Sequence, residues 1–372
     1  MKIPKISFFE QTKEPKYKNK GYIRASYAQS IAAIPASIAS VGIVKAMTKV
    51  SELAPKDTAQ LRKATQTGLK DTGLYDKGVR AYTIHQNPIL PKIKETLTTH
   101  VNNIVAKKET FDEMLDTIIP ESEKILKFNR KDYKALNAIE TEVKSTKRFT
   151  RLTKMLGEEA GKTIASVGAK VNALIFKEGK NACFLPNANK IITPDKSLQT
   201  SIFHEMGHAL NYNGGGFLKI LQKARPAAMI LPTIILTDAL LNQRKTTDEK
   251  LENNSVKNRV QNFRDGVKKH AGLLTGLAML PMVAEEGIAS LRGQGVAKKL
   301  VQNGQLSKNI YNKIKLTNLG GFASYALAAI SAVATAKFAI KVKDNIQAKY
   351  EAKKLAKFEA KQAKKQEKTK KA

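Results

Sequence analysis

The chain has 372 residues, of which 42% are hydrophobic, and a formal net charge of +33. This length is enough for one large domain or two small ones with a buried core. The single cysteine, Cys183, excludes an intrachain disulfide framework and a cysteine-rich zinc site. The positive charge favours anionic partners, either acidic lipids or nucleic acid.

The first 50 residues combine a basic segment with a weakly hydrophobic one. Lysines are spread over residues 1–26, and residues 31–44 are rich in alanine, isoleucine and serine. Small residues favour close helix packing in lipid, so we expect a membrane helix in this segment. A signal peptide fits less well because the basic region is too long. An ordinary buried helix is the remaining alternative.

Residues 51–170 predict a region of amphipathic helices. Apolar and charged residues alternate there at helical spacing, for example in 111–119 and 133–143, and prolines separate the segments. His85 and His100 have no partner at ligand spacing. We therefore expect both of these histidines to be structural or solvated.

The pattern changes after residue 170, where three short apolar runs occupy 171–176, 181–185 and 190–193. Residues 186–189 (Pro-Asn-Ala-Asn) have the composition of a turn. We expect a small sheet or hairpin here, with a strand that offers its edge to an extended substrate. A purely structural hairpin is the alternative. The residues of this edge are Asn181, Ala182, Cys183 and Phe184.

The segment His204-Glu205-Met206-Gly207-His208 is an HExxH motif in an apolar run without proline. Two histidines at i and i+4 of a helix point the same way and can bind one Zn²⁺. The glutamate between them can act as the general base for a zinc-activated water. Gly207 costs helix stability, about 1 kcal/mol relative to alanine, which suggests that another segment packs closely beside it. A chance motif on a surface helix is the alternative.

Glycines at 214–216 break the chain after the motif. Three apolar stretches follow, at about 224–241, at 271–284 and within 301–340. Each approaches the length of about 17–25 residues that a membrane span requires. We therefore expect membrane-spanning helices, with buried helices of a soluble protein as the alternative. The expected organisation has five parts. They are the basic N-terminus with a possible membrane helix (1–50), the helical region (51–170), the core that contains the motif and two apolar helices (171–300), a further apolar helix (301–340) and a lysine-rich tail (341–372).

A catalytic zinc ion normally has three protein ligands, so a third ligand must follow the motif. Glu285 and Glu286 end the second apolar stretch, where unused carboxylates would be costly. Residues 286–290 resemble the ExxxD pattern of gluzincins, whose glutamate is the third ligand and whose aspartate orients a histidine. The resemblance implies Glu286 as the ligand and Ser290 at the aspartate position. Glu285 would be the second choice, or a residue that orients a ligand.

The order of these features is similar to that in membrane gluzincins, the HtpX-type heat-shock proteases and the CAAX prenyl proteases. The resemblance covers residues 181–292 and includes Asn181, Thr193, Leu198, the HExxH motif, two apolar spans and the glutamate. It implies an integral-membrane zinc endopeptidase. The fold class that we expect is mainly α with a small β-sheet or hairpin, an α+β zincin-like core joined to membrane-spanning helices.

The sequence therefore predicts a multi-pass membrane metallopeptidase that uses Zn²⁺ and cleaves protein or peptide substrates. His204, His208 and Glu286 would hold the metal, and Glu205 would be catalytic. Basic segments, the lysine-rich tail among them, would contact acidic lipids, and the distribution of positive charge favours a non-cytoplasmic active site. An oxyanion-stabilising residue is expected among Tyr212, His270 and Arg292.

Two alternatives belong to other functional classes. The first is an inactive or weakly active zincin-fold membrane scaffold, which serine in place of aspartate at position 290 favours. The second is a basic nucleic-acid-binding protein. The second fits less well, because the charge is spread along the chain, aromatic residues are few and no binding motif is present. We therefore expect no specific nucleic-acid partner.

Overall fold

A computed structural model of the chain describes residues 49–88, 127–242 and 255–371, with isolated residues between these ranges. The membrane helix expected at 31–44 lies outside the described residues, as does most of the helix expected at 111–119. The described residues fall into two compact units. The sheet unit takes its residues from 39–226 and 281–327, and the helical unit takes its residues from 227–280 and 328–372.

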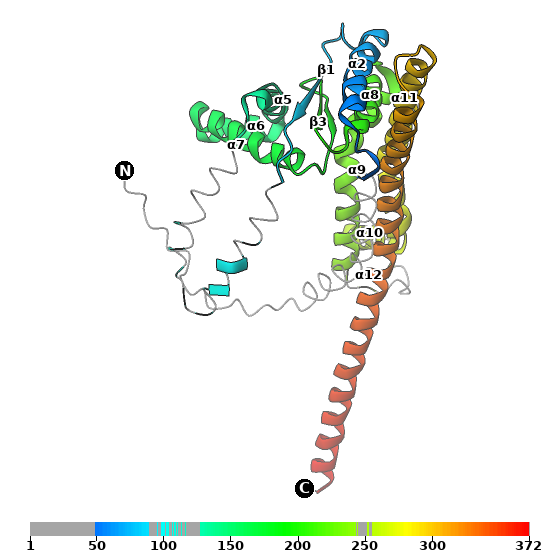
Figure 1. The fold of residues 1–372 in the computed structure, drawn as a ribbon. Helices are drawn as coiled ribbons and strands as arrows, with labels where there is room; N and C mark the ends of the chain where they lie inside the picture. Colours follow the sequence, from blue (N-terminus) through cyan, green and yellow to red (C-terminus); the bar gives the residue numbers. More distant parts are fainter. Residues whose placement is uncertain are drawn as a thin grey trace. The chain divides into compact units, whose positions relative to one another are not determined.

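The described chain is mostly helical with one small sheet, as the sequence predicts (Figure 1). The strands are β1 (Arg80–Ile84), β2 (Cys183–Leu185) and β3 (Lys190–Pro194). Two short 3₁₀ helices are η1 (Arg130–Asp132) and η2 (Gln199–Ser201). The α-helices are α2 (Pro55–Asp71), α5 (Tyr133–Lys144), α6 (Lys147–Leu156), α7 (Glu158–Lys177), α8 (Ile202–Asn213), α9 (Gly216–Leu241), α10 (Val256–Lys269), α11 (Ala271–Gln302) and α12 (Lys308–Lys371).

The sheet has the strand order β1-β3-β2, so β2 lies at one edge. β2 and β3 form the predicted antiparallel hairpin, with Cys183 opposite Ile192 and Leu185 opposite Lys190. Its turn requires Asn189 at a φ of 54°, a conformation that asparagine tolerates better than most residues. β1 pairs with β3 in parallel, which the sequence analysis did not anticipate.

The apolar run at 171–176 is helical, and its prediction as part of the sheet was wrong. It forms the last part of α7. Alanines at 165, 169 and 173 recur every four residues and are buried, as one face of a helix requires. Val171 and Ile175 lie on the exposed side of the same helix. Because both faces carry apolar residues, the helical period is hidden in this short window.

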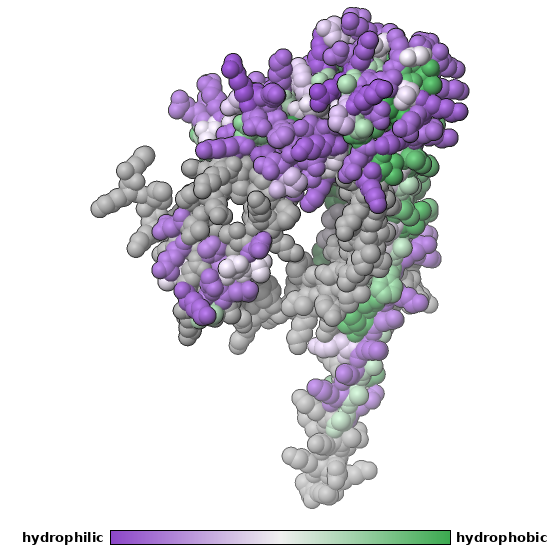
Figure 2. Space-filling view, viewed as in Figure 1, coloured by the Kyte–Doolittle hydropathy of each residue, from purple (hydrophilic) through white to green (hydrophobic). Residues whose placement is uncertain are grey.

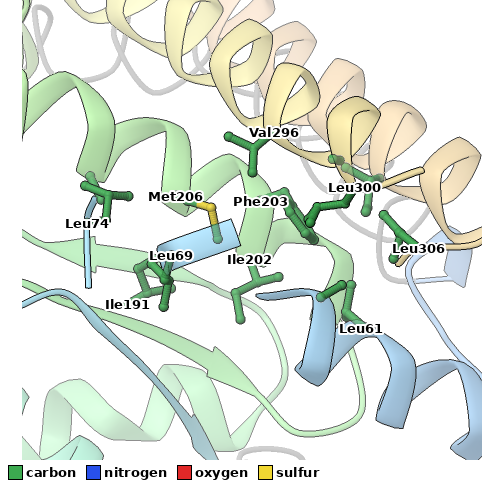
Figure 3. Packing of buried hydrophobic residues seen from close by; sticks show 14 of the residues in the cluster. Leu61, Leu69, Leu74, Ile191, Ile202, Phe203, Met206, Val296, Leu300 and Leu306 are labelled. Carbon is green, nitrogen blue, oxygen red and sulfur yellow. The ribbon is translucent and has the colours of Figure 1, made fainter. Parts of the chain in front are cut away.

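Two hydrophobic clusters cover the two faces of the sheet, because neighbouring residues of a strand point to opposite sides. Ile191 belongs to a cluster with α2, α8 and α11, and Ile192 belongs to a cluster with α5 and α7. Figure 3 shows the first cluster, in which side chains of α2, α8 and α11 meet. The helix that carries the HExxH motif is thus fixed in the main core of the sheet unit.

In the described part of the chain, three helices are long and apolar enough to cross a membrane: α9, α11 and α12. Many of their large apolar residues are exposed, including Ile230 and Ile234 in α9, Leu277 in α11 and Ile330 in α12. Hydrophobic residues gather along these long helices in the space-filling view (Figure 2). Lipid contact would account for these exposed surfaces, and the three helices are consistent with a membrane protein. The lysine-rich tail continues α12 as a helix.

Candidate metal centre

The HExxH motif lies in α8, which is held in place by its apolar side. Phe203 and Met206 are fully buried in the main core (Figure 3), and so is Ala209. These residues occupy the side of the helix opposite the histidines, since they follow a spacing of three residues. His204 and His208 therefore share the other side, with ring centroids 4.6 Å apart.

Two glycines allow α8 to approach α11 closely. A Cβ atom on Gly207 would overlap the carbonyl group of Ala289, and a Cβ on Gly293 would overlap the carbonyl group of Phe203. The two helices thus touch through their backbones at two points. The expectation that Gly207 permits a close neighbour agrees with this contact. Such an approach brings the first acidic residues of the α11 segment, Glu285 and Glu286, to the histidines.

His204, His208 and Glu286 form a buried group that could hold a metal ion. The Nε2 atoms of the two histidines are 3.0 Å apart, and Glu286 Oε2 is 3.0 Å from His204 Nε2 and 3.5 Å from His208 Nε2. Ligand atoms about 2.0–2.2 Å from a tetrahedral zinc ion are separated by about 3.3 Å from one another. The three atoms therefore already have nearly the spacing that such an ion requires.

The charges around the group also fit a divalent cation. Glu205, Glu285 and Glu286 bring three negative charges and Arg225 brings one positive charge, and the glutamates are buried. A divalent cation makes the formal sum zero when both imidazoles are neutral, and neutrality lowers the cost of burying these charges. Burial lowers the pKa of His208, but its hydrogen bonds to Glu285 and Glu286 outweigh this effect and raise that pKa to about 10. A bound metal would take the place of that proton.

The second ring nitrogen of each histidine also has a partner. His208 Nδ1 is 2.8 Å from Glu285 Oε1, which also accepts a hydrogen bond of 2.9 Å from Asn211 Nδ2. Ser290 Oγ is 3.1 Å from His204 Nδ1 and donates to the Asn318 carbonyl oxygen at 3.2 Å. Because the serine proton is committed to that carbonyl, Oγ accepts the proton of His204 Nδ1. Both Nε2 atoms are thereby left as possible metal ligands.

Arg225 of α9 joins the two glutamates, and the sequence analysis missed it. Its Nη1 atom donates to Glu285 Oε2 at 2.9 Å, and its Nη2 atom donates to Glu286 Oε1. Nη2 also lies 3.5 Å from the hydroxyl oxygen of Tyr325, a second residue that was missed. Arg225 directly precedes the apolar run of α9, and this position was the available signal, since an ionisable residue at such a run needs a partner.

A cleft of about 190 Å³ opens beside His204 and is lined by residues from several elements. Glu205 and His204 of α8 form part of its wall, and Tyr325 and Ser324 of α12 form another part. Burial raises the pKa of Glu205, while the neighbouring histidines act in the opposite direction. Among the described residues, no hydrogen bond or ion pair engages the Glu205 carboxylate. A molecule in the cleft can therefore reach this group.

The predicted edge strand lies at the same cleft, although only part of it is a strand. Asn181 and Ala182 line the cleft and precede β2, whereas Cys183 and Phe184 lie within β2. Phe184 is buried in the main core and its ring packs edge-on against Tyr212 at 5.9 Å. Only the first two of the four residues are thus exposed to the cleft. Burial raises the pKa of Cys183 well above its ordinary value, with nearby Glu205 as a further cause.

None of the three residues considered for oxyanion stabilisation lines the cleft. Tyr212 packs against the main core, Arg292 donates to the Leu210 carbonyl oxygen at 3.2 Å, and His270 ends α10 in the helical unit. Tyr325 lines the cleft instead. Comparison of the chain with models of protein families, with curated proteins and with solved structures finds no match.

Proposed function

We propose that the protein is a zinc-dependent metalloendopeptidase of the membrane, with its active site at the cleft beside α8. One observation carries this proposal. Three buried donor atoms lie within 4.8 Å of one another, and the carboxylate of Glu205 lies beside them at a cleft. Two imidazoles and one carboxylate form a donor set that suits zinc. The resemblance to membrane gluzincins has the same ligand set.

His204, His208 and Glu286 would hold the ion. Zinc bound there would supply a Lewis acid that polarises a carbonyl group and lowers the pKa of water to near 7. Glu205 would accept a proton from the attacking water and then donate it to the amine of the leaving peptide. The position of Glu205 next to His204, on the wall of the cleft, supports this assignment.

Tyr325 is our candidate for the group that stabilises negative charge on the carbonyl oxygen of the substrate. Its hydroxyl is within 3.5 Å of Arg225 Nη2, and its side chain lines the cleft with Glu205. A hydroxyl donor at this position can hydrogen-bond to an oxyanion as charge develops. The substrate would run along Asn181 and Ala182, where the chain enters the edge strand β2.

The direct test is Glu205→Gln in the full-length protein purified in detergent. Glutamine keeps the shape of the side chain but cannot accept a proton, so we expect about one zinc ion per chain and loss of peptide-bond cleavage. Metal content is measured by atomic spectrometry, and cleavage is measured with casein and a mixed peptide library. Glu140→Gln in α5 is the matched control, and it should retain both. Unchanged cleavage by Glu205→Gln would contradict the proposal.

A second candidate is a membrane scaffold in which the buried charges are structural. The bridge from Arg225 to both Glu285 and Glu286 favours it, because this bridge ties α9 to α11 without a metal ion. The same purification separates the two candidates. A scaffold predicts stable protein without stoichiometric metal and without cleavage, whereas the peptidase predicts both metal and cleavage.

A further inference from the structure

α10 carries an exposed apolar stripe that the described residues of its own unit do not cover. Val256, Val260 and Phe263 are 76%, 53% and 72% exposed. Their spacing of four and three residues places them on one side of the helix. Three large apolar side chains in a row form a surface that water solvates poorly. We therefore expect an apolar partner to cover this stripe.

A different side of α10 is fastened to the helical unit by charged and polar contacts. Arg264 Nε lies 2.8 Å from Asp238 Oδ1 near the end of α9, and Lys268 Nζ lies 2.6 Å from Asp344 Oδ1 in α12. Asn242, which follows α9, donates to Asp265 Oδ1 at 2.8 Å. These contacts leave the stripe facing away from the helices to which α10 is attached.

The place of α10 in the chain identifies the apolar partner as a membrane surface. The helix lies between α9, which ends at Leu241, and α11, which begins at Ala271, and both are candidate spans. The contacts to Asp238 and Asn242 hold α10 beside the last turn of α9. A helix held at the end of a span lies at the depth of the lipid headgroups, where one apolar side and one polar side are both satisfied.

The charge of α10 indicates which lipids it would meet. Its sequence has five basic residues and one acidic residue, Asp265. On a helical wheel, Lys257 lies at one border of the apolar stripe. A basic side chain in such a position can extend toward headgroups while the apolar residues beside it enter the acyl region. Its charge contributes attraction to an anionic surface.

We propose that α10 is an interfacial helix that inserts Phe263 between lipids and binds anionic headgroups through Lys257. The proposal rests on membrane insertion of α9 and α11 and does not depend on catalysis. It gives the protein a lipid-binding surface in the chain between two of its spans, made of residues that take no part in the candidate metal centre.

The chain has no tryptophan, so one substitution provides a single fluorescent reporter. The full-length Phe263→Trp variant is reconstituted into phosphatidylcholine vesicles that contain a small fraction of either brominated phosphatidylglycerol or brominated phosphatidylcholine. Tyr133→Trp replaces an aromatic residue that is 55% exposed at the start of α5, and it is the matched control. Flotation of the vesicles reports membrane insertion independently of the fluorescence.

We expect the fluorescence of the Phe263→Trp variant to be quenched at least about twofold more than that of Tyr133→Trp, as for a side chain at the interface. Brominated phosphatidylglycerol should quench Phe263→Trp more than brominated phosphatidylcholine at the same fraction. Replacing Lys257 with glutamine in this variant should reduce that preference by about fivefold.

Three results would overturn the inference in protein that floats with the vesicles. The first is equal quenching of the Phe263→Trp and Tyr133→Trp variants. The second is equal quenching of Phe263→Trp by the two brominated lipids. The third is blue-shifted emission from Phe263→Trp that neither lipid quenches, which would show a protein cover over the stripe. Failure to float would overturn the membrane assignment itself.

Discussion

Gly207 of α8 lies directly against the backbone of Ala289 in α11, where even one added carbon would overlap the carbonyl group. His208 follows Gly207, and Ser290 follows Ala289. The contact between the two helices therefore sets the spacing between the histidines and the residues of α11 that meet them. The candidate metal centre depends on this backbone contact as much as on the side chains that would bind the ion.

Alanine in place of the contact glycines should separate the helices and weaken metal binding. Gly293→Ala would place its Cβ against the carbonyl group of Phe203, and overpacking of this kind costs about 1–3 kcal/mol or more. Gly295→Ala, two residues later in α11, meets nothing within 4 Å and serves as the control. We expect the first variant to lose zinc and melting temperature, and the second to retain both. Equal zinc content in the two variants would show that the contact does not set the site.

The two adjacent glutamates should contribute unequally to zinc affinity. Glu286→Gln removes a carboxylate that lies 3.0 Å from His204 Nε2, whereas Glu285→Gln alters a partner of His208 Nδ1. Loss of a residue that orients a ligand typically costs about 10- to 100-fold in metal affinity. We expect Glu285→Gln to fall in this range and Glu286→Gln to lose more, as measured by competition with a chromogenic chelator. The opposite order would make Glu285 the ligand.

Ser290→Ala should weaken zinc binding without removing a ligand. The substitution leaves His204 Nδ1 without the hydroxyl oxygen at 3.1 Å, so the ring loses the contact that fixes its tautomer. We expect a fall of about 10- to 100-fold in zinc affinity. Ser324→Ala is the control, since Ser324 lines the cleft and its hydroxyl donates to the Gly321 carbonyl oxygen. An unchanged affinity in Ser290→Ala would mean that the serine has no part in orienting His204.

Arg225→Met should destabilise the protein strongly. Removing the guanidinium leaves the carboxylates of Glu285 and Glu286 buried without their cation, and breaking a buried ion pair from one side costs about 3–5 kcal/mol. Arg292→Met is the control, because Arg292 donates to a backbone carbonyl oxygen at the edge of the same region. We expect a clear fall in the melting temperature for Arg225→Met alone, and added zinc should recover part of it by restoring positive charge. Equal melting temperatures would show that the bridge is weak.

The parts of the site that local spacing determines could be predicted from the sequence. The relation between His204 and His208 follows from the helical period, and Gly207 indicated a close neighbour before that neighbour was known. Glu285 and Glu286 became candidates because two carboxylates at the end of an apolar run are costly unless they have partners, and the resemblance to gluzincins implied Glu286 as the ligand. The class of the fold, mainly helical with a small sheet and apolar helices, could be read from the same periodicities.

The rest depended on contacts that no spacing reveals. β1 pairs with β3 across more than a hundred residues, and no local spacing reveals this pairing, although Gly78 and Asn87-Pro88 mark turns on either side of Arg80–Ile84. Tyr325 reaches the cleft from α12, which the sequence presented only as an apolar stretch. Residues 171–176 were assigned to the sheet because α7 has apolar residues on both faces.

Cys183 should react slowly with alkylating reagents, and its rate should still rise above pH 9. Burial raises the pKa of this thiol, and the negative charge of Glu205 raises it further. A higher pKa means less thiolate at any given pH, and only the thiolate attacks the reagent. Because Cys183 is the single cysteine of the chain, the rate of iodoacetamide labelling followed by mass spectrometry reports on this position alone.

Glu205→Gln removes one cause of the shift in the pKa of Cys183, so the labelling curve of this variant should move to lower pH. Glu140→Gln should match the unmodified protein. A labelling curve centred near pH 8.5, the ordinary pKa of a cysteine, would show that neither burial nor Glu205 acts on this thiol.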